Sequence, residues 1–422
     1  MTRFFTLVSS LLLGSSLVVI GCGSSNATGS GGGGAASSSS GSGGATVTGT
    51  GGASATSGST SSTASGTGGS GTGGSGGGGG STGFTPRTKA RFFLSGHSLT
   101  DNPLADNVLS IAASLGNDAN YNEQIGIGSP MRVRTKGDSF QDPGWPGYSR
   151  GKNREGQNMN VIQELLSPAT LGPGERYDTL VITERHDILS TIAWEDTVGF
   201  LRHYHDRLIA GNSAASTLFY HSWLDIDKAN PTPWITHEKG ALAAWECVAA
   251  KVNLTLAAEN RADRVTTLPA GAALVKLVEE ILAGHVAGIT GTQTERLNRI
   301  FNDNVHMTAL GSYYVSLVTY AALFHSSPEG AAAPPGIDTA PVADMQKIAW
   351  EFVKAYYTQP APGEHTMAEC RAFMVDGVCA SFWNLLGQPG QVAGCQSTFS
   401  NVDADQNPFR WPDAKLKLWP DP

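Results

Sequence analysis

Three polar residues in two distant stretches of the sequence have side chains suited to hydrolysis by a serine. Ser98 follows an apolar run and Gly96 in the stretch FFLSGHSLTDN, and Asp303 and His306 lie three positions apart in DNVH. A serine hydroxyl is a weak nucleophile until a base removes its proton, and an imidazole base works best when a third group fixes its tautomer. Because one turn of backbone can present an aspartate and a histidine three apart towards one serine, both stretches are candidates for nucleophilic catalysis.

Apolar periodicity predicts the elements that position these stretches, because strands and helices alternate along the chain from about residue 86. Short apolar runs predict strands at residues 90–94, 121–127, 177–183, 217–223 and 265–268. Helical spacing predicts helices at residues 103–115, 161–166, 194–209, 241–258, 272–283, 308–324 and 345–357. The alternation predicts an α/β fold in which helices cover both faces of a mostly parallel sheet.

Polar or glycine-bearing loops follow the first three predicted strands. They are GHSL at 96–99, GIG at 126–128 and ERHD at 184–187, and DNVH at 303–306 precedes the helix at 308–324. In open parallel sheets, ligands bind beyond the carboxyl ends of the strands. We therefore expect one edge of the sheet to gather these four loops.

The chain resembles the SGNH (GDSL-type) hydrolases over about residues 88–324. The resemblance rests on the GHSL step, on the Gly-x-Gly thirty residues later, and on Asp303-x-x-His306. It implies a three-layer α/β/α sandwich with a mostly parallel, flavodoxin-like central sheet. It also implies the activity of a serine esterase.

By position, the resemblance implies that Ser98 is the nucleophile, His306 the general base and Asp303 the residue that orients the base. The backbone amides of Ser98 and Gly128 would form part of the oxyanion hole, where a glycine lets the backbone approach closely. The α/β-hydrolase elbow is disfavoured, because it needs glycine on both sides of x-Ser-x and Thr100 stands at the second position.

One position departs from the family pattern. Where these hydrolases usually carry Gly-x-Asn-Asp after the third strand, this chain carries Glu184-Arg185-His186-Asp187, so the asparagine amide that normally donates to the oxyanion is absent. His186 could donate in its place, since a neutral imidazole carries one N–H, and Arg185 could supply charge instead. Losing one donor outright typically lowers turnover about a hundred-fold or more. We therefore take His186 as the hypothetical third donor.

Each of these residues also has a purely structural interpretation. Ser98, followed by Asp101 and Pro103, fits a loop that opens a helix, where serine is a common cap. The glycines at 126 and 128 fit an ordinary turn, and DNVH fits an N-terminal box for the helix at 308–324. Chemistry is favoured because all of the residues occur together, in the family order and at strand ends.

Further residues are candidates for substrate or metal binding. His221 and Trp223 close the fourth predicted strand at the same edge of the sheet, so we expect them to line the substrate cleft, although a tryptophan is more often packed in a core. His203 and His205 suggest a metal pair, but residues two apart on a helix do not face each other, and a solvated helix surface is the simpler interpretation. The sequence has no metal-ligand, phosphate-loop or nucleotide motif. We expect no metal and no cofactor.

The N-terminal stretch has the composition of a processing signal followed by a tether. Residues 1–21 combine Arg3, an apolar run and Gly21, and resemble a bacterial lipoprotein signal that ends before a lipidated Cys22; a plain secretory signal is the alternative. Residues 22–84 are almost entirely Gly, Ser, Thr and Ala, a composition that stays flexible because it buries little apolar surface. We expect a lipid anchor at the outer membrane, the cell surface or the periplasm.

The remaining sequence is acidic and holds an even number of cysteines. A formal net charge of −8 without a basic cluster argues against a nucleic-acid partner. In an exported chain, Cys247, Cys370, Cys379 and Cys395 allow two disulfides with three connectivities. We expect a hydrolase-like domain at 85–360 and a cysteine-bearing extension at 361–422. The sequence carries no signal for the oligomeric state.

Together these features predict a surface-tethered serine esterase that hydrolyses carboxylic esters. Acetyl groups on polysaccharide are the expected substrate class, because a long tether and an exported location suit a polymer too large to import. Two alternatives stand beside this prediction. One is an esterase for lipids or other acyl chains, and the other is a catalytically silent carbohydrate-binding module that has kept the scaffold without the asparagine.

Overall fold

A computed structural model describes residues 84–101, 103–137 and 147–411. Every described residue belongs to the second of the chain's two units, residues 77–422. The predicted lipoprotein signal, Cys22 and the tether up to residue 83 lie outside the described residues. The fold and the site are those of the second unit.

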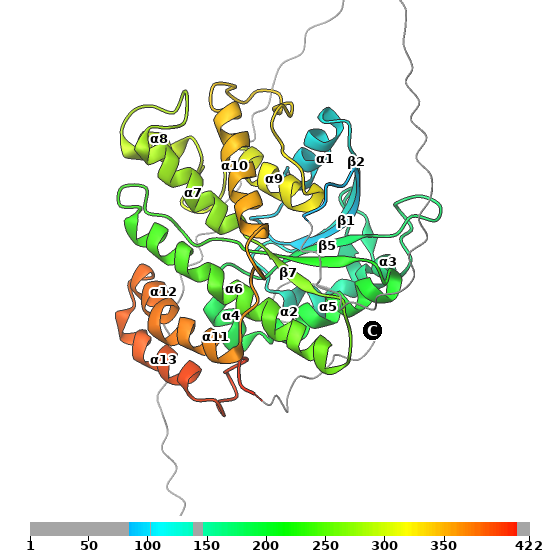
Figure 1. The fold of residues 1–422 in the computed structure, drawn as a ribbon, viewed down its shortest axis with the longest axis vertical. Coiled ribbons are helices and arrows are strands. Elements are labelled where there is room, and N and C mark those ends of the chain that lie inside the picture. Colours follow the sequence, from blue (N-terminus) through cyan, green and yellow to red (C-terminus); the bar gives the residue numbers. More distant parts are fainter. Residues whose placement is uncertain (1–83, 102, 138–146, 412–422) are drawn as a thin grey trace, which may run out of the picture. The chain divides into compact units, whose positions relative to one another are not determined.

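Among the described residues, five parallel strands form the central sheet (Figure 1). They are β1 (Lys89–Gly96), β2 (Asp118–Ile125), β5 (Thr179–Thr183), β6 (Ser216–Tyr220) and β7 (Val265–Leu268), in the order β2-β1-β5-β6-β7. Each overlaps a strand predicted from apolar runs. Because β2 and β5 lie on opposite sides of β1, the strand order reverses between β1 and β5, and ligands of open α/β sheets bind at such a reversal.

The strands alternate their side chains between two faces, and helices cover each face. Phe92 and Leu94 of β1 pack into one hydrophobic cluster, whereas Phe93 packs into the other, as the two-residue period of a strand requires. The first cluster is shared with α1 (Leu104–Ser114), α7 (Ala270–Ala283), α9 (Ala309–Phe324) and α10 (Val342–Tyr357). The second is shared with α2 (Met131–Lys136), α3 (Val161–Leu166), α5 (Thr197–Gly211) and α6 (Thr232–Ala258). Figure 1 shows the two helical layers on either side of the sheet, and the predicted three-layer α/β/α sandwich is confirmed.

Helix α6 is long and apolar. By length and composition it could cross a membrane, which is weak evidence because a core helix passes the same test. Its residues Trp245, Val248 and Val252 are buried in the second cluster, so α6 is a core helix of the sandwich. It begins at Thr232, nine residues before the predicted start at 241. Pro233 lies in its first turn, where a proline is tolerated because the backbone N–H groups of that turn have no partner within the helix.

The helix predicted at 194–209 is wrong at its start. The structure has two helices, α4 (Ile188–Trp194) and α5, which are separated at Glu195 and Asp196. Asp196 has a φ of 51°, a left-handed conformation that a right-handed helix cannot contain. Two six-residue helices, α2 and α8 (Gln293–Asn298), were not among the predicted helices.

Two disulfides hold the C-terminal extension, which contains α11 (Met367–Phe373), α12 (Cys379–Leu385) and α13 (Val392–Ser400). Cys247 of α6 pairs with Cys370, and Cys379 pairs with Cys395. This confirms the two predicted disulfides and selects one of the three connectivities. Buried side chains of all three helices join the cluster that contains α6, so the extension packs as part of the second helical layer.

Candidate active site

A serine, a histidine and an aspartate form a hydrogen-bonded chain, here called the triad, at the carboxyl edge of the sheet. His306 Nε2 lies 3.1 Å from Ser98 Oγ, and His306 Nδ1 lies 2.7 Å from Asp303 Oδ2. Ser98 follows β1, whereas the other two residues precede α9. The side chains of His306 and Asp303 are 44% and 54% exposed and Ser98 is partly exposed, so solvent reaches the triad.

Asp303 is held ionised by its own loop. Its Oδ1 accepts hydrogen bonds from the backbone N–H groups of Val305 (2.8 Å) and His306 (2.7 Å), which leaves Oδ2 for the imidazole. Partial burial is the largest single influence and opposes ionisation, but the hydrogen bonds from His306 and Val305 outweigh it and lower the pKa of Asp303 to about 2. An ionised Oδ2 requires a proton on Nδ1, so Nε2 presents its lone pair to the Ser98 hydroxyl.

The loop that carries Asp303 and His306 is closed at its base. Phe301 and Met307 form an antiparallel bridge across it. Helix α9 after the loop is capped by the side chain of Thr308, which accepts a backbone hydrogen bond from the first turn. Because Thr308 is the cap, the interpretation of DNVH as the N-terminal box of this helix is wrong.

The turn at Ser98 is tight, and Gly96 makes it possible. A Cβ atom on residue 96 would lie 1.7 Å from Thr100 Oγ1, so any other residue would displace that side chain. Helix α1 has Pro103 at its N-cap and no hydrogen bond from a capping side chain. The interpretation of Ser98 as a helix cap is therefore wrong, and its hydroxyl contacts His306 instead.

His97 anchors the turn that carries the serine. Its ring is buried, Nδ1 accepts the Leu99 N–H at 3.3 Å, and Nε2 lies 3.0 Å from the carbonyl oxygen of Glu184. A carbonyl oxygen only accepts, so Nε2 carries the proton. Burial, assisted by Arg134 and His186 nearby, lowers the pKa of His97 well below 6.5. The ring is therefore neutral and held in one tautomer.

The glycine loop after β2 lies beside the serine turn. The Gly126 N–H donates to the Gly96 carbonyl at 2.9 Å, which joins the exits of the two strands. Gly128 has a φ of 66°, a left-handed conformation that glycine adopts without the steric penalty of other residues. Within the described parts of the chain, no group accepts a hydrogen bond from the backbone N–H of Ser98 or Gly128. The two amides suit the role of oxyanion donors.

His186 follows β5 and lies next to the serine turn. Its ring centroid is 6.1 Å from that of His97. Burial lowers the pKa of His186 below 6.5, although Asp187 and Asp225 oppose this, so the neutral ring keeps one N–H donor. Arg185 forms a two-point pair with Asp187, at 2.6 and 2.9 Å, which commits its charge away from an oxyanion. His186 is the better placed of the two candidates.

His221 and Trp223 do not line a cleft, contrary to the prediction. Both side chains are 0% exposed. The Trp223 Nε1–H donates to the carbonyl of Val305 at 2.8 Å. The His221 ring packs on Gly271, where an added Cβ would lie 2.9 Å from Nε2. The segment after β6 supports the loop at 303–306 from within the core, so these side chains face protein rather than solvent.

A second histidine chain is buried at the other end of the sheet. His205 lies 2.9 Å from Thr217 Oγ1 and 2.7 Å from Asp263 Oδ2, and Thr217, near the start of β6, is 0% exposed. The interpretation of His203 and His205 as a solvated helix surface is wrong, since both are buried. In the part of the chain that the structure describes, no group of His, Cys, Asp and Glu side chains could hold a metal ion.

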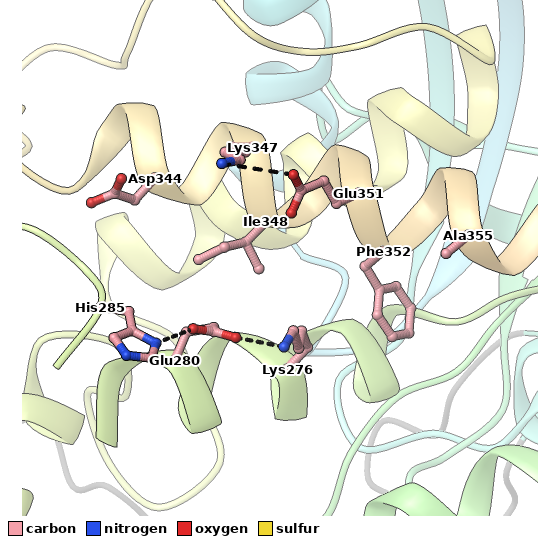
Figure 2. Close-up of a pocket in the computed structure, with 9 residues that line it drawn as sticks. All are labelled: Lys276, Glu280, His285, Asp344, Lys347, Ile348, Glu351, Phe352 and Ala355. Carbon is pink, nitrogen blue, oxygen red and sulfur yellow. Dashed lines mark hydrogen bonds and ion pairs between the residues drawn. The ribbon is translucent and has the colours of Figure 1, made fainter. Parts of the chain in front are cut away.

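A hollow of about 400 Å³ lies between α7 and α10 (Figure 2). Most of its charged side chains are paired with one another: Glu280 with both Lys276 and His285, and Lys347 with Glu351. Asp344 instead accepts the backbone N–H of Ala287 at 2.8 Å. The apolar part of its lining consists of Ile348, Phe352 and Ala355. No triad residue lines this hollow.

Two residues with ionisable side chains beneath the site, Arg134 and Glu184, were given no role by the sequence analysis. Both are 0% exposed. The Arg134 guanidinium donates to the carbonyl of Ser129 at 2.7 Å, and the Glu184 carboxyl accepts the Met131 N–H at 3.0 Å. The available sequence signal was ERHD at 184–187, a run of charged and polar residues directly after an apolar strand.

Comparisons with known proteins give no family. A scan against protein-family models and a search of curated proteins give no match. Among solved structures, the crystal structure of a DUF4886 family protein from Bacteroides uniformis matches with a TM-score of 0.43 and 10% sequence identity, over 65% of this chain and 98% of that chain. A likeness of this size carries no conclusion about activity. The site must therefore be interpreted from its own geometry.

Proposed function

We propose that this protein is a serine esterase that hydrolyses carboxylic esters at Ser98. The observation that carries the proposal is the solvent-exposed chain of hydrogen bonds from Ser98 through His306 to Asp303. The buried chain through His205 shows that similar side chains also meet for structural reasons. Exposure at the carboxyl edge of the sheet, next to backbone amides that can donate, distinguishes the triad from it.

In the proposed reaction, Ser98 Oγ attacks the ester carbonyl carbon while His306 Nε2 takes its proton. The tetrahedral intermediate expels the alcohol, which receives that proton, and the acyl group stays on Ser98. A water molecule, deprotonated by His306, then attacks the acyl-enzyme; the bond to Ser98 Oγ breaks, Oγ takes the proton back from His306, and the carboxylic acid leaves. Asp303, ionised above a pKa of about 2, stabilises the imidazolium in both steps.

The negative charge on the tetrahedral intermediate requires preorganised donors. We assign this role to the backbone N–H groups of Ser98 and Gly128 and to the ring N–H of His186. The hydrogen bond between Gly126 and Gly96 supports the assignment, because it holds the two amide-bearing turns side by side. The neutral state of His186 supports it as well.

For the substrate, we propose acetyl esters on an exported polysaccharide, with a lipid anchor at Cys22. Two disulfides support an extracytoplasmic location. An esterase for lipids or longer acyl chains is the alternative with the same chemistry. A catalytically silent carbohydrate-binding module is the alternative from another class, and the observation that favours it is His186 at the position of the family asparagine.

A fluorophosphonate probe tests the proposal directly, because it labels a serine only when that serine is activated. We expect mass spectrometry of the labelled full-length protein to map the probe to Ser98. Rates on p-nitrophenyl esters from acetate to longer chains then separate an acetyl esterase from a lipid esterase. Glycan binding without labelling or hydrolysis would favour the silent module, and labelling of a different serine would refute the assigned nucleophile.

Replacing His186 by alanine is expected to lower kcat about a hundred-fold with little change in KM, because an oxyanion donor acts in the transition state. His186→Asn, which restores the family amide, is expected to recover most of that loss. Steady-state kinetics on p-nitrophenyl acetate measure both variants, with His285→Ala, in the hollow between α7 and α10, as a control. Wild-type kcat in His186→Ala would show that the ring donates nothing to the oxyanion.

Replacing Trp223 by phenylalanine is expected to lower kcat about ten-fold, since small displacements of a catalytic group reduce rates strongly. Phenylalanine keeps the aromatic packing but leaves the Val305 carbonyl without its donor, at about 1–2 kcal/mol of stability. Kinetics and thermal unfolding measure the two effects. Trp245→Phe, at another buried tryptophan, is the control. Equal kcat in both variants would mean that the indole N–H does not position the histidine loop.

A further inference from the structure

Glu184 contacts all three loops that supply the proposed nucleophile and oxyanion donors. Its Oε1 accepts hydrogen bonds from the backbone N–H groups of Met131 (3.0 Å) and Arg185 (2.7 Å), and its Oε2 accepts from the Thr197 hydroxyl (2.9 Å). Its backbone carbonyl accepts the Nε2–H of His97 (3.0 Å). Glu184 is 0% exposed, so these partners take the place of water.

The partners of Glu184 are close in sequence to the proposed oxyanion donors. Met131 lies three residues after Gly128, and two other partners are the direct neighbours of His186 and Ser98. The loops leave three adjacent strands of the sheet, β2, β1 and β5. The carboxyl group of Glu184 therefore joins the loops after β2 and β5, and its backbone carbonyl joins the loop after β5 to the turn after β1.

Arg134 holds the same three loops through a second set of hydrogen bonds. Its buried guanidinium donates to the Ser129 carbonyl at 2.7 Å, to Ser95 Oγ at 3.1 Å and to the Thr183 carbonyl. These acceptors lie in the glycine loop, at the end of β1 and at the end of β5. Two buried residues of opposite charge thus fix the exits of the three strands.

We propose that Glu184 is a positioning residue of the oxyanion hole, which fixes the Gly128 amide and the His186 ring relative to Ser98. The inference rests on the proposed esterase function. Glu184 touches no reacting atom. Its effect is on the distances between groups that do.

The Glu184 carboxyl group is buried, and burial of a carboxylate is unfavourable unless hydrogen bonds or a charge compensate for the lost water. Burial raises the pKa of Glu184 to about 7, against the opposing effects of the Arg134 charge and of the hydrogen bonds from Arg185 and Met131. Oxyanion donors stabilise a transition state most when they need not move as the charge develops. A rigid carboxyl bridge between the donor loops meets that requirement.

Two substitutions of Glu184 distinguish a role of its hydrogen bonds in positioning the loops from a role of its negative charge. Glu184→Gln keeps an oxygen for the two backbone amides and offers an N–H to the Thr197 hydroxyl, so kcat on p-nitrophenyl acetate is expected within about three-fold of wild type. Glu184→Ala removes all three side-chain bonds, so kcat is expected to fall about a hundred-fold while KM changes by less than about three-fold. Loss of activity in Glu184→Gln equal to that in Glu184→Ala would overturn the inference.

Glu164 offers a matched control at the other end of β5. It is a buried carboxyl that accepts hydrogen bonds from the Ala169 N–H and from the hydroxyls of Thr170 and Tyr177. Glu164→Ala is expected to lower the Tm as Glu184→Ala does, but to leave kcat unchanged. An equal fall of kcat in both variants would show a purely structural role. Should Glu184→Ala not fold, Thr197→Val removes one of the three bonds and is compared with Glu164→Ala in the same way.

Hydrogen exchange separates this inference from the proposed function. In Glu184→Ala, and not in Glu164→Ala, exchange is expected to rise at residues 126–131 and 184–187. If the wild-type protein hydrolyses no ester, the proposed function fails, while raised exchange in both segments still supports the positioning of these loops by Glu184. Unchanged exchange in both segments overturns the inference whatever the kinetics.

Discussion

Replacing Ser98 by alanine is expected to lower kcat/KM for p-nitrophenyl acetate at least about a thousand-fold. The variant loses the hydroxyl that lies 3.1 Å from His306 Nε2, so no acyl-enzyme forms. The proposed oxyanion donors, which are the backbone amides of Ser98 and Gly128 and the ring of His186, stay in place. The rate of hydrolysis that remains in the variant therefore measures the contribution of these donors without the nucleophile. Because Ser98 is partly exposed and its hydroxyl supports no other described segment, we expect stability within about 1 kcal/mol of wild type.

Ser110→Ala is the matched control for this loss. Ser110 is an exposed serine of α1 whose hydroxyl donates to the Asp106 carbonyl, and its replacement is expected to leave hydrolysis and fluorophosphonate labelling unchanged. The two variants are compared with wild type at equal amounts of full-length protein, after their unfolding temperatures have been shown to be equal. Hydrolysis that survives in Ser98→Ala would mean that another group is the nucleophile.

Replacing Asp303 by asparagine is expected to lower kcat about ten-thousand-fold, through the tautomer of His306. The asparagine oxygen can still accept the N–H groups of Val305 and His306, so the loop keeps its shape. Its NH₂ group then faces Nδ1, which must accept, and the imidazole proton moves to Nε2. A protonated Nε2 cannot take the proton of Ser98. Steady-state kinetics measure the loss.

Asp338→Asn provides the control for Asp303→Asn. Asp338 also accepts a backbone N–H, from Ala340, and pairs with Arg299 at 2.7 Å, but it lies on the surface outside the site. Its replacement is expected to leave kcat unchanged. Because the triad acts as a unit, Ser98→Ala combined with Asp303→Asn is expected to be no slower than Ser98→Ala alone. A fall of less than about ten-fold in Asp303→Asn would argue against His306 as the base.

The sheet and the meeting of the triad residues could be predicted from local pattern. Apolar runs such as FFL and LVI predict buried parallel strands, because both faces of such a strand are apolar. The structure confirms the α/β/α sandwich that these strands imply. The serine and the DNVH stretch were predicted to meet because each stands where a strand ends or a helix begins. Their hydrogen bonds now support that geometry, whereas their catalytic roles stay predictions for the experiments above.

Burial of polar side chains was not predictable, because it depends on partners far away in the sequence. Trp223 follows a strand in the way that a cleft residue would, and only the distant Val305 carbonyl makes it a core donor. The burial of Arg134 and Glu184 was not predicted, since charged side chains are almost never fully buried unless paired. The pairing of Cys247 with Cys370 likewise depends on the packing of α11 against α6.

The described chain enters the fold at the end of β1 opposite the triad. Phe84 stacks on Trp350 and Tyr357 of α10, with ring centroids 5.7 and 5.5 Å apart. The eight residues of β1 then span about 26 Å, at roughly 3.3 Å per residue, before the turn to Ser98. A mechanical load applied through the preceding residues would therefore be resisted first by these stacked rings.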